Sequence, residues 1–358
     1  MARATASDVL VQALRDWGVE VVFGLPGDGI NGIIEALRER RDEIRFVQVR
    51  HEESAAFMAC GYAKLTGKLG VCLATSGPGG IHLLNGLYDA KLDGAPVLAI
   101  TGLQHHDLIQ THTQQDVELD KLFMDVALYS ARVMSPGHVR SVADIACRTA
   151  LAQHGVAHVT VPVDLQSMDV EDKDASERNV PGHSEAVFAA RRSCPSREEL
   201  EAAAAVLNAG ERIVILAGRG AIGAGAELET IAETLGAVIA KPLLGKQAVP
   251  DDSPYTTGPV GLLGSRPSQE ALEDCDTLLI VGSSFPYIEF YPRPGQARGV
   301  QIDRDATRIG LRFPVEVGLV GDSRATLCAL IPLLERRDER KFLEQAQRGM
   351  TEWRKLME

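Results

Sequence analysis

Residues 44–67 read IRFVQV-RHEE-SAAFMACGYAKL-TG and decide the fold of the first half of this 358-residue chain. Residues 44–49 alternate in the manner of a β-strand, and residues 54–65 are typical of a helix that Gly67 ends. Glu52 stands between these elements, at the expected carboxyl end of the strand, where open α/β sheets bind their ligands. Two interpretations of this carboxylate stay open: a desolvated acid or base, or a charge that stabilises the helix start.

Segments with strand-like and helix-like patterns alternate around this stretch. The expected strands are Val21–Gly24, Ile44–Val49, Gly70–Thr75, Val97–Thr101 and Ala157–Val163. The expected helices are Asn31–Arg40, Ser54–Leu65, Ile81–Lys91, Val117–Leu128 and Val139–Gln153. Apolar strands separated by helices of this length predict a parallel sheet that is covered on both faces.

A second unit follows a polar stretch, residues 169–182 (DVEDKDASERNVPG), whose composition suits a linker. Its expected strands are Arg212–Ala217, Ala237–Ala240, Thr277–Gly282, Gly299–Ile302 and Val315–Val320. Its other expected elements are the helices Ser196–Asn208, Ala224–Leu235, Ser323–Glu335 and Arg340–Leu356, and a long loop over Lys241–Gly264. The predicted fold class is α/β, with two doubly wound parallel-sheet domains at residues 1–180 and 181–358.

The composition is that of an ordinary globular protein, with 45% hydrophobic and 24% charged residues. A net charge of −12, spread along the chain, argues against a nucleic-acid surface. We expect no signal peptide in MARATASDVL and no membrane span, and hence a cytoplasmic location. The six cysteines lack CxxC spacing, so we expect reduced core residues and no metal site.

Two further loops are expected at the same sheet edge as Glu52. Residues 24–29 (GLPGDG) and 75–80 (TSGPGG) each follow a strand and contain glycines, which permit sharp turns and close approach to a ligand. Beyond the second loop, three polar residues recur at helical spacing and are expected to share one face: His82, Asn85 and Asp89. An alternative for His82 is a core histidine bonded to a backbone carbonyl.

The segment 103–116 (LQHHDLIQTHTQQD) is a long polar loop after an expected strand. Loops of this kind commonly form lids or substrate walls. Its histidines, His105, His106 and His112, lack helical spacing and a companion group of cysteines or carboxylates. We therefore expect this loop to contact a substrate and not to hold a metal.

Four loops of the second half carry nucleotide-like features. Residues 218–223 (GRGAIG) fit the GxGxxG turn of dinucleotide sites, but the acidic residue expected about 20 positions later is absent near Ile239. The match is therefore partial, and favours a nucleotide near this edge over an ordinary NAD site. Residues 258–264 (GPVGLLG), 281–287 (VGSSFPY) and 301–303 (QID) offer backbone donors, hydroxyls and one acid at expected strand ends. Each motif alone is more often a plain loop.

Several stretches together resemble the thiamine-diphosphate enzymes of the pyruvate oxidase and acetolactate synthase family, and the bacterial pyruvate oxidases most. They are GLPGDGING (24–32), RHEESAAFMACGYAKLTG (50–67), TSGPGGIHLLNGLYDAKLDGAPVLAITG (75–102), SSFPYIEFYP (283–292) and QIDRDATRIG (301–310). The resemblance covers nearly the whole chain. It implies a subunit of three domains: a pyrimidine-binding domain, a central domain that often holds FAD, and a diphosphate-binding domain.

By this resemblance residues 1–180 are the pyrimidine-binding domain and residues 181–358 the central domain. The third domain is marked by Gly-Asp-Gly followed at a set distance by Asn, which holds Mg²⁺ on the cofactor diphosphate. Residues 27–29 (GDG) have no such Asn, and residues 321–323 read GDS. We therefore expect the chain to be the first two of three domains, inactive alone, with the Mg²⁺ ligands in the missing one.

The resemblance also assigns roles to residues. Glu52 matches the glutamate that shares a proton with the aminopyrimidine ring of thiamine diphosphate, and is the expected catalytic residue. Gln115 matches a glutamine near the substrate, while Gln114 stands where the family often has Phe. The other expected contacts to thiamine diphosphate are Pro26, Gly27, Thr75, Pro78, His82 and Asn85. The expected contacts to FAD are Gly218, Arg219, Gly220, Val260, Gly261, Leu262, Leu263, Ser283, Ser284, Phe285, Pro286, Tyr287 and Asp303.

The implied reaction is the oxidative decarboxylation of pyruvate, in which FAD accepts two electrons. One alternative is acetolactate synthesis or another non-oxidative conversion of a 2-keto acid. Another is a non-catalytic remnant that binds a nucleotide or mediates oligomerisation. The resemblance further implies a homodimer or homotetramer, and places any contact with a quinone or a membrane surface in the missing C-terminal part.

Overall fold

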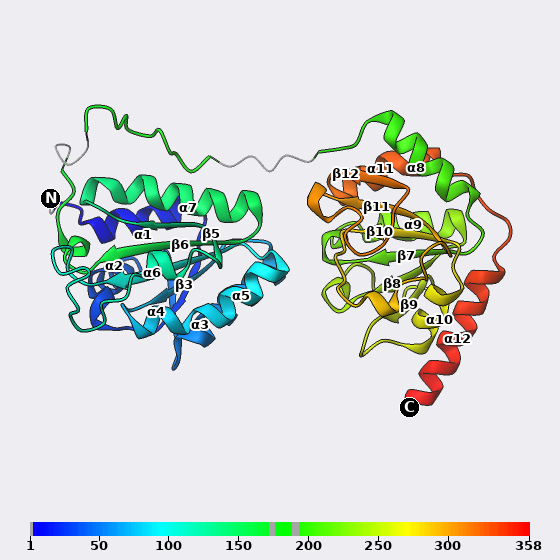
Figure 1. Ribbon diagram of the computed structural model, residues 1–358, viewed down its shortest axis with the longest axis horizontal. Helices are drawn as coiled ribbons and strands as arrows, with labels where there is room; N and C mark the ends of the chain where they lie inside the picture. The colour runs from blue at the N-terminus through cyan, green and yellow to red at the C-terminus, as the bar shows by residue number, and fades with distance from the viewer. Residues whose placement is uncertain (1–2, 172–175, 188–192) are drawn as a thin grey trace. The chain divides into compact units, whose positions relative to one another are not determined.

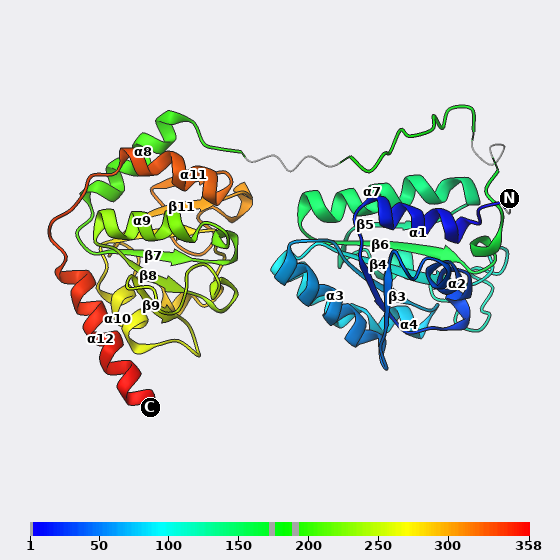
Figure 2. The same ribbon diagram turned by 180° about the vertical axis from the view of Figure 1, so that it is seen from behind.

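The computed structural model describes residues 3–171, 176–187 and 193–358. The chain forms two compact units, Met1–Ala190 and Arg191–Glu358 (Figures 1 and 2). Each unit contains one sheet of six parallel strands, so the predicted fold class, two α/β domains with doubly wound sheets, is confirmed. Part of the predicted linker, residues 172–175, lies outside the described residues.

The first sheet has its fully buried strands in the middle. Its strands are β1 (Val21–Gly24), β2 (Arg45–Gln48), β3 (Gly70–Ala74), β4 (Val97–Leu103), β5 (Ala127–Arg132) and β6 (Val156–Pro162), in the order β2-β1-β3-β4-β6-β5. Every residue of β3, β4 and β6 is buried, whereas no residue of the edge strand β2 is fully buried. This pattern is the one expected for a parallel sheet covered on both faces.

Helices cover both faces of the first sheet. They are α1 (Ala6–Asp16), α2 (Asn31–Glu39), α3 (Glu52–Thr66), α4 (Pro78–His82), α5 (Leu84–Asp93), α6 (Leu119–Leu122) and α7 (Val139–Gln153). One core layer joins α1, α2 and α7 to the sheet, and the other joins α3 and α5 to it (Figures 1 and 2). Gly67, in the left-handed conformation with φ 71°, ends α3 as its sequence predicts.

Three details of the first unit differ from the sequence-based expectation. The predicted helix Val117–Leu128 is wrong: only the short α6 forms there, and Ala127–Arg132 is the edge strand β5. The pairing of β5 with β6 decides this, because a half-exposed edge strand has no distinctive pattern of its own. The predicted helix Ile81–Lys91 is divided at Leu83 into α4 and α5. Helix α1 was not predicted, although Thr5 and Asp8 form a capping box at its start.

The second sheet has the order β12-β11-β10-β7-β8-β9. Its strands are β7 (Ile213–Ala217), β8 (Val238–Lys241), β9 (Thr256–Pro259), β10 (Thr277–Val281), β11 (Arg298–Asp303) and β12 (Val317–Val320). Its helices are α8 (Arg197–Ala209), α9 (Gly225–Leu235), α10 (Arg266–Asp274), α11 (Ser323–Leu330) and α12 (Lys341–Met357). One core layer joins α8, α9 and α11 to the sheet, and α10 and α12 pack on the other face.

Two elements of the second unit lie where none was predicted. The expected loop Lys241–Gly264 contains β9, which pairs with β8, and α10 follows it. The core position predicted for all cysteines is wrong for two of them. Cys194, in the segment before α8, and Cys328, on the outer side of α11 beside Glu227, are exposed. No described helix combines the length and apolar character that a membrane span requires.

Candidate active site

The first sheet changes its direction of strand addition at β1, because the chain places β2 on one side of β1 and β3 on the other. Such a switch point leaves a crevice outside the carboxyl ends of the strands, and ligands bind there. Residues 24–29 follow β1 and residues 75–80 follow β3, while Glu52 follows β2. The three predicted segments therefore leave one edge of the sheet, next to its switch point.

Glu52 is a buried carboxylate at the first position of α3. Only 7% of the residue is exposed, and Ala55 and Ala56 behind it are fully buried. His51 caps the helix by accepting the N–H of Glu53 on its Nδ1 at 3.3 Å. A glutamate that served only the helix dipole would keep its charge in water, since glutamate is rarely buried without a partner. The burial favours the acid/base interpretation of Glu52.

The two oxygens of Glu52 have different surroundings. His82 Nδ1 lies 3.0 Å from Oε2, so His82 pairs with a carboxylate and not with the backbone carbonyl of the alternative interpretation. Within the described residues Oε1 makes no hydrogen bond. A Cβ atom added at Gly79 would stand 3.2 Å from Oε1. Gly79 thus keeps a space open in front of the unpaired oxygen of a largely buried carboxylate, and that space suits a hydrogen-bond donor of a ligand.

Thr75 joins the two glycine loops. Its Oγ1 accepts the N–H of Gly29 at 3.0 Å and donates to Asp28 Oδ1 at 3.2 Å. A Cβ atom at Gly27 would lie 2.6 Å from the Thr75 Cβ, so only glycine permits this approach. Of the other predicted residues of these loops, Pro26 is exposed and Pro78 is the first residue of α4. The structure therefore brings Gly27 and Thr75 into direct contact.

Gln115 reaches the same loop from the segment 103–116. Ser76 Oγ donates to Gln115 Oε1 at 2.7 Å. Gly77 has φ 58°, and a Cβ atom there would lie 2.8 Å from the Gln115 Cβ. Gln115 Nε2 makes no hydrogen bond to the described residues. The side chain thus presents an amide donor beside the 75–80 loop.

The expected common face of three polar residues is only partly present. His82 ends α4, whereas Asn85 and Asp89 belong to α5. Asn85 donates to Glu53, and Asp89 pairs with the Lys64 amine at 2.8 Å, about three helical turns along α3 from Glu52. His82 therefore contacts the buried carboxylate, while Asp89 attaches α5 to the far part of α3.

Among the described residues, one group of three side chains has potential metal-ligating atoms close together, within 4.8 Å: His51, Glu52 and His82. The two imidazole rings are stacked, with centroids 4.6 Å apart and planes inclined by 27°. Imidazole binds metal through a nitrogen lone pair in the ring plane. Nearly parallel rings direct these lone pairs side by side and not to one point, so we assign no metal to the group.

The second sheet has its own switch point, between β7 and β10. There Gly218 N–H donates to the Val281 carbonyl and Gly220 N–H to the Gly282 carbonyl, each at 2.9 Å. A Cβ atom at Gly218 would lie 2.4 Å from the Gly282 carbonyl oxygen. Contact between two loops of the protein therefore explains these glycines. Helix α9 begins only at Gly225, beyond the GxGxxG pattern, which accounts for the partial match to a dinucleotide turn.

The other predicted flavin contacts follow neighbouring strands. A Cβ atom at Gly261, where φ is 114°, would lie 3.1 Å from the Phe285 ring. Arg308 donates to Ser284 Oγ at 3.1 Å. The buried members of the predicted set here are Val260, Ser283, Phe285 and Asp303, and the exposed members are Leu262, Leu263, Pro286 and Tyr287. The predicted stretches thus contact one another at two places. Residues 218–220 pack against residues 282–283, and Gly261 packs against Phe285.

Charged side chains lie beside these loops. Burial raises the pKa of the Asp303 carboxyl at the end of β11, and its Oδ1 accepts the N–H of Asp305 at 3.0 Å. Burial, with the neighbouring charge of Arg219, lowers the pKa of Arg304. Two arginines and a buried acid at strand ends form a polar site that suits an anionic ligand with hydroxyl groups.

Sequence reasoning assigned no role to four residues that lie in or beside the first site: His51, Glu53, Asp28 and Ser76. His51 stacks on His82, Glu53 accepts from Asn85, and Ser76 binds Gln115. Each lies inside a motif that was recognised. Their partners come from other loops, so the pattern of each motif by itself held no signal for these contacts.

Two family models match the chain. Residues 4–122 match the thiamine pyrophosphate enzyme N-terminal TPP-binding domain, and residues 200–330 match the thiamine pyrophosphate enzyme central domain. The first match contains Glu52, the 75–80 loop and Gln115. The second contains all the loops at the carboxyl edge of the second sheet that were predicted to contact a flavin.

Relatives agree with these matches. The putative thiamine pyrophosphate-containing protein YdaP of Bacillus subtilis is 40% identical over 353 residues, which cover 99% of this chain and 60% of YdaP. An uncharacterized 42.6 kDa protein of Pseudomonas amyloderamosa is 37% identical over 96% of this chain and 85% of its own. The pyruvate oxidase of Lactiplantibacillus plantarum is 35% identical over 98% of this chain and 57% of the enzyme.

Acetolactate synthase large subunits are more distant relatives, such as the probable subunit of Methanocaldococcus jannaschii at 30% identity. The chain spans about 60% of the length of YdaP and of the pyruvate oxidase. Both family models, in their order along the chain, and a buried glutamate at the switch point of the first sheet lead to the same assignment. The chain belongs to the thiamine pyrophosphate enzymes, of which it contains the N-terminal and central domains.

Proposed function

We propose that Glu52 is the carboxyl group that shares a proton with the aminopyrimidine ring of thiamine diphosphate in a pyruvate oxidase-like enzyme. The observation that carries this proposal is the burial of Glu52 together with its unpaired Oε1, which faces the space kept open by Gly79. A ring nitrogen that carries a proton is a donor of the kind Oε1 lacks. His82 occupies the other oxygen of this largely buried carboxyl, so Oε1 is the acceptor left for such a donor.

The residues around Glu52 support this role. His82 holds Oε2 at 3.0 Å, which fixes the orientation of the carboxyl and leaves Oε1 for the ligand. Gly27 and Thr75 bring the two glycine loops together, so that backbone can approach a flat ring closely. Thiamine diphosphate, when bound, supplies a carbon nucleophile and an electron sink for decarboxylation of a 2-keto acid. Gln115 Nε2 would donate a hydrogen bond to the substrate.

Oxidation of pyruvate with FAD is the reaction we favour. The arginines and the buried Asp303 at the edge of the second sheet suit the diphosphate and ribityl hydroxyls of a flavin nucleotide, and the named pyruvate oxidase relative is more similar than the acetolactate synthases. We place the Mg²⁺ ligands outside the N-terminal and central domains, in a diphosphate-binding domain. The second candidate is acetolactate synthesis, which the same relatives support less strongly, and the third is a non-catalytic remnant.

We further propose that the first unit associates with a second copy of the chain. Large apolar side chains are exposed on α3, α4 and α5: Phe57, Met58, Leu65, Ile81, Tyr88 and Leu92. A group of exposed apolar side chains on neighbouring helices is typical of an interaction surface. The expected assembly is a homodimer or homotetramer, and sedimentation of the purified chain tests it.

The test of the reaction uses Glu52→Gln, with Glu53→Gln as the matched control. In the complete enzyme Glu52→Gln lowers pyruvate turnover by about 10²–10⁴-fold, the usual contribution of acid–base catalysis. Glu53 is also in the first turn of α3 but its side chain contacts Asn85, so the control retains turnover. Near-normal turnover of Glu52→Gln contradicts the role.

Flavin absorbance separates the reactions. A yellow enzyme whose flavin is bleached by pyruvate supports oxidation. Flavin that stays oxidised while acetolactate accumulates supports the second candidate. A chain that binds neither thiamine diphosphate nor FAD, even when joined to a diphosphate-binding domain, supports the third.

A further inference from the structure

The loop that carries Gln115 has an unusual backbone. Three residues other than glycine lie in the left-handed region within a short stretch: Gln110 (φ 65°), His112 (φ 62°) and Gln115 (φ 61°). Side chains with a Cβ atom disfavour this conformation, and glycine is the residue that usually adopts it. Such a backbone persists only where surrounding contacts hold it, and it is concentrated at functional sites. The contacts that hold this loop therefore indicate what its shape serves.

Asp116 provides the first of these contacts. Its Oδ1 accepts the N–H of Gln110 at 3.1 Å, and its Oδ2 accepts the N–H of His112 at 3.0 Å. The N–H of Asp116 donates to the Thr113 carbonyl at 3.2 Å. One carboxylate thus closes residues 110–116 into a turn and satisfies the backbone donors of two left-handed residues. The third, Gln115, is the residue directly before it.

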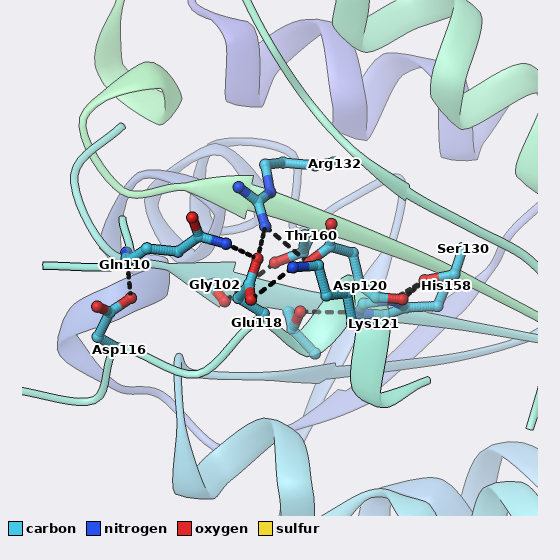
Figure 3. A network of polar contacts seen from close by, with 11 residues as sticks. Gly102, Gln110, Asp116, Glu118, Asp120, Lys121, Ser130, Arg132, His158 and Thr160 are labelled. Carbon is cyan, nitrogen blue, oxygen red and sulfur yellow. Dashed lines mark hydrogen bonds and ion pairs between the residues drawn. The ribbon is translucent and has the colours of Figure 1, made fainter. Parts of the chain in front are cut away.

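A second set of contacts attaches this turn to the sheet. The Gln110 side chain donates to Glu118, and Arg132, at the end of β5, lies 3.5 Å from Glu118 and donates to Asp120 at 2.8 Å. Figure 3 shows this series, which runs from Asp116 and Gln110 through Glu118 to Arg132. Gln110 is bound from both sides, through its backbone by Asp116 and through its amide by Glu118. The turn is therefore fixed relative to β5, the edge strand of the first sheet.

We propose that Asp116 is a positioning residue that holds Gln115 against the 75–80 loop and so directs its amide donor to the substrate. The inference rests on the proposed function, since only there is Gln115 a substrate contact. Ser76 occupies Gln115 Oε1 at 2.7 Å, which leaves Nε2 for the carboxylate of a 2-keto acid. Asp116 acts through the backbone and does not touch the substrate.

Hydrogen exchange of backbone amides in the purified chain tests the positioning directly. Asp116→Ala is expected to raise the exchange rate of residues 108–117 and of residues 74–80 by about tenfold or more, because the loop opens locally and releases its contact with Ser76. Gln115→Ala is expected to affect residues 74–80 but not residues 108–112. This order of effects shows that Asp116 acts through Gln115.

Asp107→Ala is the matched control, because its carboxylate lies in the same loop and makes no hydrogen bond to the described residues. It leaves both segments unchanged. The proposal is overturned if residues 108–117 of Asp116→Ala exchange at the wild-type rate. It is also overturned if their exchange rises while residues 74–80 stay protected. General unfolding would also expose α7, so unchanged protection of residues 139–153 identifies a local effect.

Kinetics of the complete enzyme provide the second test. Asp116→Ala lowers kcat/KM for pyruvate by about 10–10²-fold, the loss expected from a small misplacement of a binding group, and leaves the Kd of thiamine diphosphate within about twofold. The double variant Gln115→Ala, Asp116→Ala is expected to have the same kcat/KM for pyruvate as Gln115→Ala alone. If the losses in kcat/KM of the two single variants add, the proposal is overturned. If the wild type does not use pyruvate, the proposed function fails, and the exchange pattern still decides whether Asp116 positions Gln115.

Discussion

Gly79→Ala tests the space in front of Glu52. The added Cβ atom would lie 2.7 Å from the Thr75 Cγ2 and 3.2 Å from Glu52 Oε1. The first contact is about 1 Å shorter than a normal contact between carbon atoms, so Thr75 or α4 must move. Overpacking of this kind costs about 1–3 kcal/mol. For a unit of this size the loss lowers the melting temperature by about 5 °C. The second contact fills the place in which a ligand donor would meet Oε1, so affinity for thiamine diphosphate falls as well.

The double variant Thr75→Ser, Gly79→Ala separates these effects. Serine removes Cγ2 and keeps the hydroxyl that accepts the Gly29 N–H, so thermal unfolding should return close to the wild-type midpoint. The Cβ atom still faces Oε1, so calorimetry on the complete enzyme should still find thiamine diphosphate binding weakened by about tenfold or more. Restored cofactor affinity in the double variant would refute the reasoning, because the space before Oε1 would then have no part in binding.

His112→Gly should raise the free energy of unfolding, since glycine adopts φ 62° without strain, while His112→Val should lower it by about 1 kcal/mol or more; urea unfolding measures both. The hydrogen bond to Asp164 raises the pKa of His106, and although burial opposes it, the bond from His106 lowers that of Asp164. The stabilisation of the loop by this pair is therefore fully present between the ordinary values of 3.8 and 6.5, and it is lost as pH rises through the raised His106 pKa or falls through the lowered Asp164 pKa. Loop exchange, corrected for its intrinsic pH dependence, should thus be slowest near pH 5, and Asp164→Asn should remove this dependence. Gly86→Ala should lower the melting temperature, because its Cβ atom would lie 2.6 Å from the Phe57 backbone nitrogen and would separate α5 from α3; an unchanged midpoint would contradict this packing.

The central strands could be predicted from the sequence because burial on both faces leaves a mark in composition. Strand β3 is a continuous apolar run, so the sequence alone assigns the loop that follows it to the carboxyl edge of the sheet. Glu52 was recognisable for a different reason. Its place at the junction of a strand and a helix follows from two local patterns, and neither depends on distant residues.

The remaining elements depend on partners far away in the sequence. Strand β5 is half-exposed, so only its pairing with β6 distinguishes it from a helix. The contact of His82 with Glu52, where the sequence left a core histidine as an equal alternative, joins residues 30 positions apart. The left-handed residues Gln110 and His112 have no sequence signature, because glycine is the residue that normally marks such a backbone.

The most direct test of the central claim is the exchange of the C2 proton of thiamine diphosphate with deuterium, followed by NMR after rapid acid quench in the complete enzyme. If Glu52 shares a proton with the pyrimidine ring, Glu52→Gln slows this exchange by about 10²-fold or more, and Glu53→Gln leaves it unchanged. The same exchange rate in wild type and Glu52→Gln, with the cofactor bound equally in both, would contradict the account.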